Sequence, residues 1–163
     1  MHVELSIFWT IFCNVTGWAA IQIGLAWIFT RLPARWFAPP GILGWEHNGD
    51  VYQRAFRIKK WKKLLPDGAS WFEGGFAKRR LSGSERAYLQ RFLQETWRGE
   101  MCHWTVLAWT PLFFTWNPLW GDCVVVAYAI VSNIPCILVQ RYNRARLARL
   151  ISLRERAHAT VPR

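Results

Sequence analysis

The residues with the clearest chemical potential are Glu100 and His103, an acid and a histidine three positions apart. On an α-helix such residues are neighbours, so the carboxylate can orient the imidazole while the imidazole takes up a proton. At about 100° per residue, Thr96, Glu100 and His103 continue the apolar face of the preceding residues, whereas Glu95 and Arg98 point elsewhere. The alternative is a structural, hydrogen-bonded pair that locks two helices together.

Two further groups of polar residues can bind anions. They are Gln140-Arg141-Tyr142-Asn143-Arg144, which follows an apolar run, and the cluster Lys59-Lys60-Trp61-Lys62-Lys63. Arginine is suited to bidentate contact with phosphate, so both groups could hold a polyanionic substrate. The alternative is that they lie on anionic lipid, where each basic residue contributes about 1 kcal/mol. Lipid binding leaves Gln140 and Asn143 unexplained.

Apolar segments must position these groups, because 52% of the residues are hydrophobic although the net charge is +11. No charged residue occurs in 5–29, a run longer than the roughly 20 residues that cross a bilayer and too long for the core of a cleavable signal peptide. Two more apolar stretches, about 101–121 and 123–139, are separated by turn-forming residues at 117–122. The sequence predicts three transmembrane helices, the last two as a tight hairpin.

The distribution of charge predicts the orientation of these spans. All 21 Lys and Arg residues lie either between Arg31 and Arg98 or from Arg141 onward. Three spans with the N-terminus outside place both basic segments in the cytoplasm, as the positive-inside rule requires. We therefore expect a multi-pass cell-membrane protein with its N-terminus out and its C-terminus in.

The remaining segments complete an all-α integral membrane protein with one domain over residues 1–163. A basic, amphipathic cytoplasmic segment covers 31–98, with a loop at 66–83. Ser82 or Ser84 is expected to cap a helix that begins at Glu85 and continues past Gly99 into the second span. Pro135 can bend the third span, and a basic C-terminal helix is expected over 140–157.

Several motifs together resemble one family. They are Glu95-Thr96, Arg98, Glu100 and His103-Trp104, then Asn133, Pro135 and Val139-Gln140-Arg141-Tyr142-Asn143-Arg144, with Arg31-Leu32-Pro33, Lys60-Trp61-Lys62 and Asp67-Gly68 upstream. From about Arg31 to about Leu150 the chain resembles the glycosyl-diaponeurosporenoate acyltransferases, small membrane enzymes of staphyloxanthin-type carotenoid biosynthesis.

The resemblance implies transfer of a fatty acyl chain to a sugar hydroxyl, the primary one in the known pathway, of a glycosylated carotenoid or related glycolipid. It implies no metal and no cofactor, with acyl-CoA or an acyl carrier protein as the donor substrate and membrane lipid as a partner. Catalytic roles are expected for His103 and Glu100. Substrate binding is expected for Glu95, Thr96, Arg98, Trp104, Gln140, Arg141, Tyr142, Asn143, Arg144, Lys60 and Lys62.

The sequence favours direct attack on the acyl donor over a covalent intermediate. No histidine has an aspartate five positions on, and no G-x-S-x-G nucleophile motif occurs. We expect His103 to accept the hydroxyl proton and Glu100 to orient the imidazole of His103. Asn143 and Tyr142 are candidate hydrogen-bond donors to the thioester oxygen.

Two other kinds of function stay open. The same pair of residues could serve a different transferase or a lipid hydrolase. A protein of another class, a non-catalytic membrane scaffold or subunit of a lipid-synthesis complex, would use His103 for helix packing and the basic segments for contact with lipid or protein. Nucleic-acid binding is not expected, because the cytoplasmic membrane surface accounts for the positive charge.

Overall fold

The computed structural model describes residues 3–65, 75, 76 and 85–159, and every regular element in these residues is helical. The long helices are α1 (Ile7–Arg31), α4 (Arg86–Ala108) and α5 (Leu119–Ala159). Shorter elements are η1 (Ala34–Trp36), η2 (Gly44–Gly49), α2 (Asp50–Phe56), α3 (Ile58–Trp61), η3 (Lys62–Leu64) and η5 (Thr110–Thr115). The predicted loop at 66–83, the motif Asp67-Gly68 and the candidate caps Ser82 and Ser84 lie outside the described residues, apart from Gly75 and Phe76.

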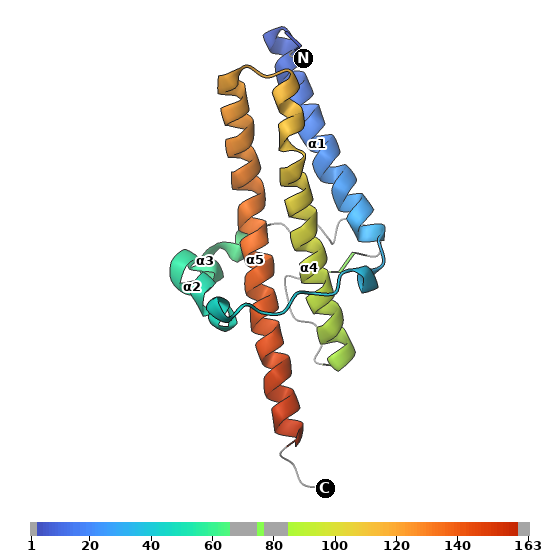
Figure 1. Cartoon of the computed structure of the whole chain (residues 1–163), viewed down its shortest axis with the longest axis vertical. Helices are drawn as coiled ribbons and strands as arrows, with labels where there is room; N and C mark the ends of the chain where they lie inside the picture. The colour runs from blue at the N-terminus through green and yellow to red at the C-terminus, as the bar shows by residue number, and fades with distance from the viewer. Residues whose placement is uncertain (1–2, 66–74, 77–84, 160–163) are drawn as a thin grey trace.

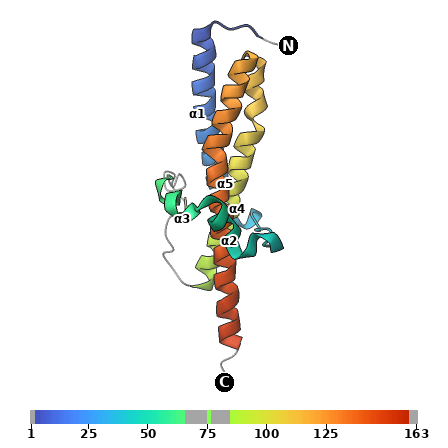
Figure 2. The same ribbon diagram turned by 90° about the vertical axis from the view of Figure 1, so that its left-hand side faces the viewer.

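The three long helices run side by side, as Figure 1 shows. The N-terminus and the connection between η5 and α5 lie at one end, and the C-terminal part of α5 extends to the other. After η1, residues 37–43 cross α4 and α5 to reach η2, and Figure 2 shows α2 and α3 about halfway along α5. The short elements therefore gather around the middle of the long axis.

Two helices, α1 and α5, are long and apolar enough to cross a membrane. Only 6% of the most apolar window of α1 and 22% of that of α5 are buried within the protein, unlike the core helices of a soluble protein. Large side chains such as Ile7, Phe8 and Val15 on α1 and Val131 on α5 are more than half exposed. Such contiguous apolar surface is expected to face lipid.

The prediction of three uninterrupted apolar helices is wrong for the second span. The α-helix of that segment stops at Ala108, and the 3₁₀ helix η5 follows with Pro111 in its first turn. Proline has no N–H and its ring clashes with the carbonyl of residue i−4, so an α-helix cannot run through this point undisturbed. Among the described helices, two and not three meet the criteria for a membrane span.

Helix α5 contains two parts of the C-terminal region that were predicted separately. The third apolar stretch and the basic helix expected at 140–157 are one continuous helix, α5, which begins at Leu119 and contains Pro135. The connection before it is shorter than expected, because Gly121 and Asp122 already belong to its first turn. Asp122 there interacts favourably with the helix dipole.

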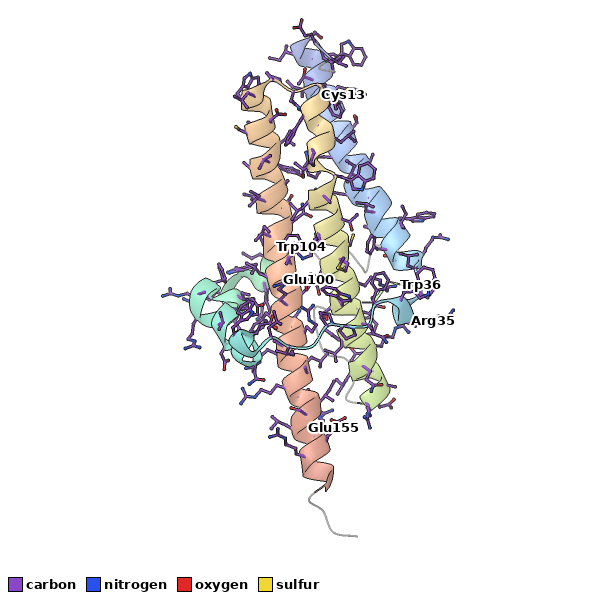
Figure 3. All side chains as sticks on the ribbon, in the orientation of Figure 1. Cys13, Arg35, Trp36, Glu100, Trp104 and Glu155 are labelled. Carbon is purple, nitrogen blue, oxygen red and sulfur yellow. The ribbon has the colours of Figure 1, made fainter. Side chains whose placement is uncertain are left out.

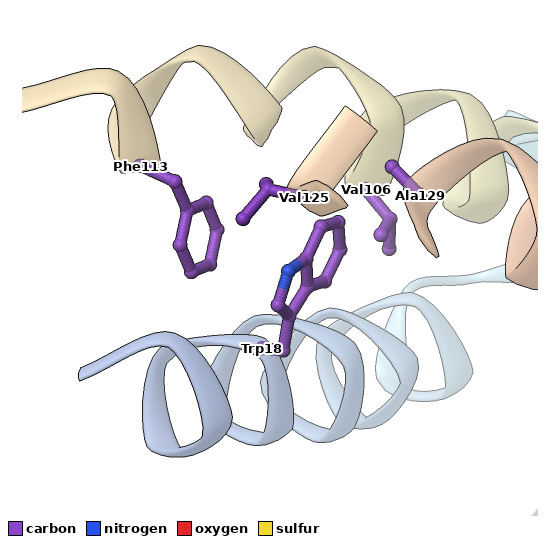
Figure 4. Close-up of a cluster of buried hydrophobic side chains, with 5 residues drawn as sticks. All are labelled: Trp18, Val106, Phe113, Val125 and Ala129. Carbon is purple, nitrogen blue, oxygen red and sulfur yellow. The ribbon is translucent and has the colours of Figure 1, made fainter. Parts of the chain in front are cut away.

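The three long helices pack around one apolar cluster near the N-terminal end. Figure 4 shows Trp18 of α1 facing Phe113 of η5, with Val106, Val125 and Ala129 around them. The rings of Trp18 and Phe113 stack with centroids 4.9 Å apart. A Cβ atom on Gly17 would lie 3.1 Å from Phe113, so a glycine at this position allows the close approach of α1 and η5.

Candidate functional site

Helix α4 buries polar side chains on two of its faces. Thr96 and Glu100 have no exposed surface, as their position beside Leu89 and Phe92 predicts. Glu95 and Arg98 were expected to point away from this stripe, but they are 1% and 7% exposed. The reason is that the segment after α1 covers this second face, which a helical wheel of α4 alone cannot reveal.

Arg98 joins α4 to the end of α1. It forms an ion pair with Glu95, and its Nη1 donates to the carbonyl oxygens of Thr30 and Leu32 at 3.3 and 2.9 Å. Carbonyls at a helix C-terminus lack partners within the helix, so the guanidinium satisfies them. This pair, predicted to bind substrate, makes structural contacts with α1.

Glu100 is the centre of a buried charge cluster. Its Oε1 accepts hydrogen bonds from Arg141 Nε at 2.7 Å and Trp104 Nε1 at 3.2 Å, and its Oε2 accepts one from Arg144 Nη1 at 2.6 Å. The two guanidinium groups offset the negative charge of a carboxylate that has no exposed surface. Figure 3 places Glu100 and Trp104 near the level of Trp36, just beyond the end of α1.

The cluster continues into the segment after α1. Tyr52 lies near Arg141 and donates to Glu46 Oε1, while Glu46 Oε2 accepts the backbone N–H of Leu43 at 2.8 Å. Burial raises the pKa of Tyr52, and its hydrogen bond to Glu46 and the charge of Glu46 raise it further. Tyr52 therefore remains protonated at neutral pH and can donate to the carboxylate.

His103 lies one turn from Glu100 and contacts Asn133 of α5. The amide nitrogen of Asn133 donates to Ala129 O at 3.0 Å and to Ser132 Oγ, which leaves Oδ1 as the acceptor. His103 Nδ1 lies 2.9 Å from that oxygen, so this assignment places the proton on Nδ1. The basic lone pair of the neutral ring is then on Nε2.

The other predicted binding residues divide between surface and core. Lys62 Nζ donates to Asn143 Oδ1 at 3.3 Å and lies 5.2 Å from the ring centroid of the buried Tyr142. Lys60 is exposed. Gln140 Oε1 is buried and accepts no hydrogen bond in the part of the chain that the structure describes. An acceptor of this kind can accept a hydrogen bond from a hydroxyl group of a ligand.

The structure thus brings the two motifs of α4 and α5 together, because the helices are antiparallel neighbours. Glu100 and Trp104 meet Arg141 and Arg144, and His103 meets Asn133. Sequence reasoning gave no role to Asn133, Glu46 or Tyr52. For Glu46 and Tyr52 no sequence signal was available, since their partners are distant in the chain. For Asn133, a polar residue in an apolar helix was a usable signal.

Comparison with known proteins agrees with these motifs. Residues 33–153 match the family model described as glycosyl-4,4'-diaponeurosporenoate acyltransferase. The chain is 29% identical over 149 residues to proteins of that name from Staphylococcus aureus strains USA300, NCTC 8325 and MRSA252, with 89% of each chain covered. No solved structure matches the chain.

Proposed function

The chain belongs to the glycosyl-4,4'-diaponeurosporenoate acyltransferase family, and from this membership we propose that it is a membrane enzyme that transfers a fatty acyl chain to a sugar hydroxyl. The acceptor is a glycosylated carotenoid or a related glycolipid, and the donor is a thioester of coenzyme A or of an acyl carrier protein. The observation that carries the proposal is the contact between His103 and Asn133 beside the buried charge cluster of Glu100.

The placement of the helices supports a multi-pass arrangement in the cell membrane. Helices α1 and α5 are the candidate spans, and Val106 and Phe113 pack against Trp18 between them. Because Val106 of α4 and Phe113 of η5 contact residues inside both spans, they lie at the same depth in the bilayer as those residues. In this proposal α4 and η5 together make the middle crossing. The positive charge of residues 31–98 and of the residues from Arg141 onward favours a cytoplasmic C-terminus and an external N-terminus.

In the proposed mechanism His103 is the general base. Nε2 takes the proton from the acceptor hydroxyl as its oxygen attacks the thioester carbon, and the C–S bond then breaks. The same proton passes to the departing thiolate, so the products are an ester and a free thiol. The hydrogen bond from Nδ1 to Asn133 keeps the ring in the tautomer and orientation that this step needs.

Glu100 acts through the arginines in this proposal. Its carboxylate holds Arg141 and Arg144 about one turn of α4 from His103, where positive charge can stabilise the oxyanion that forms on the thioester. Arg141 is 29% exposed and Arg144 only 6%. Arg141 is therefore the arginine that a substrate can reach.

The test is an assay of the purified protein in nanodiscs with labelled acyl-CoA and a glycosylated diaponeurosporenoate. The parent is compared with His103→Gln, whose amide can still donate to Asn133 but cannot act as a base. Removal of a general base is expected to lower turnover about 10²- to 10⁴-fold, while the unfolding midpoint stays close to that of the parent.

Each result has a clear meaning. Labelled glycolipid formed by the parent and nearly lost in His103→Gln supports both the reaction and the base. Free fatty acid as the main product indicates a hydrolase instead. A folded parent that transfers no acyl group to this or other glycolipids favours the non-catalytic membrane subunit.

A further inference from the structure

Lys62 of η3 is held against α5 in a half-buried position. Its ammonium group donates to Asn143 Oδ1 at 3.3 Å and lies over the ring of Tyr142, 5.2 Å from the centroid. An ammonium group has three protons to donate, and Asn143 accepts one of them. The contacts with α5 thus fix the position of the ammonium group and use only part of its hydrogen-bonding capacity.

Arg146 follows on α5, one turn beyond Tyr142, and lies against the turn that begins α2. A Cβ atom on Gly49 would be 3.3 Å from Arg146 Cγ, and Gly49 has a φ of +90°, which favours glycine. The guanidinium is 3.7 Å from Asp50, in a pair whose side chains are 45% and 51% exposed. An exposed pair of this length neutralises the arginine only weakly.

The surroundings of Lys62 are electrostatically unfavourable for a cation. Burial lowers the pKa of Lys62, and the nearby positive charges of Lys59, Arg146 and Lys63 lower it further. Arg141 and Arg144, which lie on α5 with Arg146, have a counter-charge, because both are paired with the carboxylate of Glu100. Positive charge therefore accumulates at Lys62 and Arg146 without equal compensation from the carboxylates that the structure describes there.

We propose that Lys62 and Arg146, together with Asn143, bind the phosphate group of an anionic ligand. A phosphate offers several acceptor oxygens, which suit both the ammonium group and the fork of a guanidinium. It would also relieve the repulsion among the four cations. The sequence had suggested Arg141 and Arg144 for this task, but their contacts with Glu100 make Arg146 the better partner for Lys62.

The same chemistry can come from two sources. One is the phosphates of an acyl-CoA donor, which rests on the proposed function, and the other is the headgroup of an anionic phospholipid. The first arm of the test titrates coenzyme A into the protein in nanodiscs of neutral lipid. Lys62→Gln and Arg146→Gln are each expected to weaken binding about tenfold.

Two further variants serve as controls. Lys62→Arg keeps the positive charge and is expected to keep most of the affinity. Arg54→Gln removes an exposed charge from α2, which does not contribute to the repulsion at Lys62, and is expected to bind like the parent.

The second arm uses nanodiscs that contain phosphatidylglycerol and counts the phosphatidylglycerol retained by the purified protein by mass spectrometry. Loss of retained lipid in Lys62→Gln and Arg146→Gln, without binding of coenzyme A to the parent, assigns the site to a headgroup. If the parent binds neither ligand, or if both variants bind like Arg54→Gln, the proposal is overturned. If the parent transfers acyl groups but Lys62→Gln and Arg146→Gln bind both ligands as the parent does, only the phosphate site is rejected. If the two variants bind more weakly but the parent transfers no acyl group, only the enzymatic function is rejected.

Discussion

At Glu100, one buried carboxylate compensates two guanidinium groups. Glu100→Gln would leave Arg141 and Arg144 without a counter-charge while keeping the size of the side chain. Removing one partner of a buried ion pair typically costs about 3–5 kcal/mol, and the partial exposure of Arg141 favours the lower part of that range. We expect a clearly lower stability towards unfolding in detergent micelles.

Glu155→Gln is the matched control for this prediction. Glu155 pairs with Arg86 at 3.0 Å, but the two side chains are 52% and 74% exposed, so the substitution should cost less than about 1 kcal/mol. Equal losses in the two variants would mean that the cluster at Glu100 does not stabilise the fold.

The hydrogen bond between Asn133 and His103 leads to a prediction about pH. Asn133→Asp would place a negative charge beside Nδ1–H, which stabilises the protonated imidazole relative to the neutral one. Because the base must be neutral, the acidic limb of the turnover profile should move to higher pH. Turnover with the labelled acyl-CoA, measured across pH for parent and variant, checks this, and a change in amplitude without a shift would assign Asn133 a structural role only.

Among the helices, the approach of α1 to η5 depends on a glycine. Gly17→Leu would force a side chain against Phe113, where even a Cβ atom has a contact of only 3.1 Å. Overpacking of this kind costs about 1–3 kcal/mol and should separate α1 from the Trp18 cluster. The measurement is the unfolding midpoint together with the fluorescence of the tryptophans.

Gly24→Leu tests whether the effect depends on position. Gly24 is on the same helix, and a Cβ atom there would meet nothing within 4 Å. The added side chain should therefore extend into lipid with little change in stability. If Gly24→Leu destabilised the protein as much as Gly17→Leu, the contact with Phe113 would not be the cause of the loss. Helix propensity would not explain such a loss either, because leucine is the better helix former of the two residues.

The sequence predicted those elements that local patterns determine. An uncharged apolar run predicted α1, and helical spacing of apolar residues predicted α4 and its continuity past Gly99. The break at Pro111 was missed, although the residue itself carries the reason. The apolar stretch to Val139 and the basic helix after it lie on one continuous helix, because a change from apolar to basic side chains alters the surroundings of a helix and not its backbone.

The candidate site was predictable in its residues but not in its contacts. The stripe on α4 predicted that Glu100 is buried, yet the arginines that pair with it come from another helix. Glu46 and Tyr52 belong to a segment without periodicity, and they reach the cluster only because residues 37–43 cross two helices. Contacts of this kind depend on tertiary packing and have no local signature.

For the whole molecule, the proposed orientation predicts which ends are accessible. In a variant with its four cysteines replaced by serine, Trp120→Cys lies at the start of α5 and Leu153→Cys near its other end. Both positions are more than half exposed. A membrane-impermeant maleimide added to intact cells should label Trp120→Cys and leave Leu153→Cys unlabelled until the cells are opened. The reverse pattern would invert the topology, and labelling of both on intact cells would contradict a membrane crossing by α5.

Because α5 continues without a break from the apolar stretch to Arg141 and Arg144, the thickness of the bilayer can affect the geometry of the charge cluster at Glu100. At about 1.5 Å per residue, the part from Leu119 to Gln140 is about 33 Å long, close to the hydrocarbon thickness of a typical membrane. A bilayer thinner than this length is accommodated by tilting of the helix. Arg141 and Arg144 follow directly on the same helix, so such a tilt would move them relative to Glu100 on α4. Hydrophobic mismatch between α5 and the surrounding lipid would thus act on the site through the helix itself.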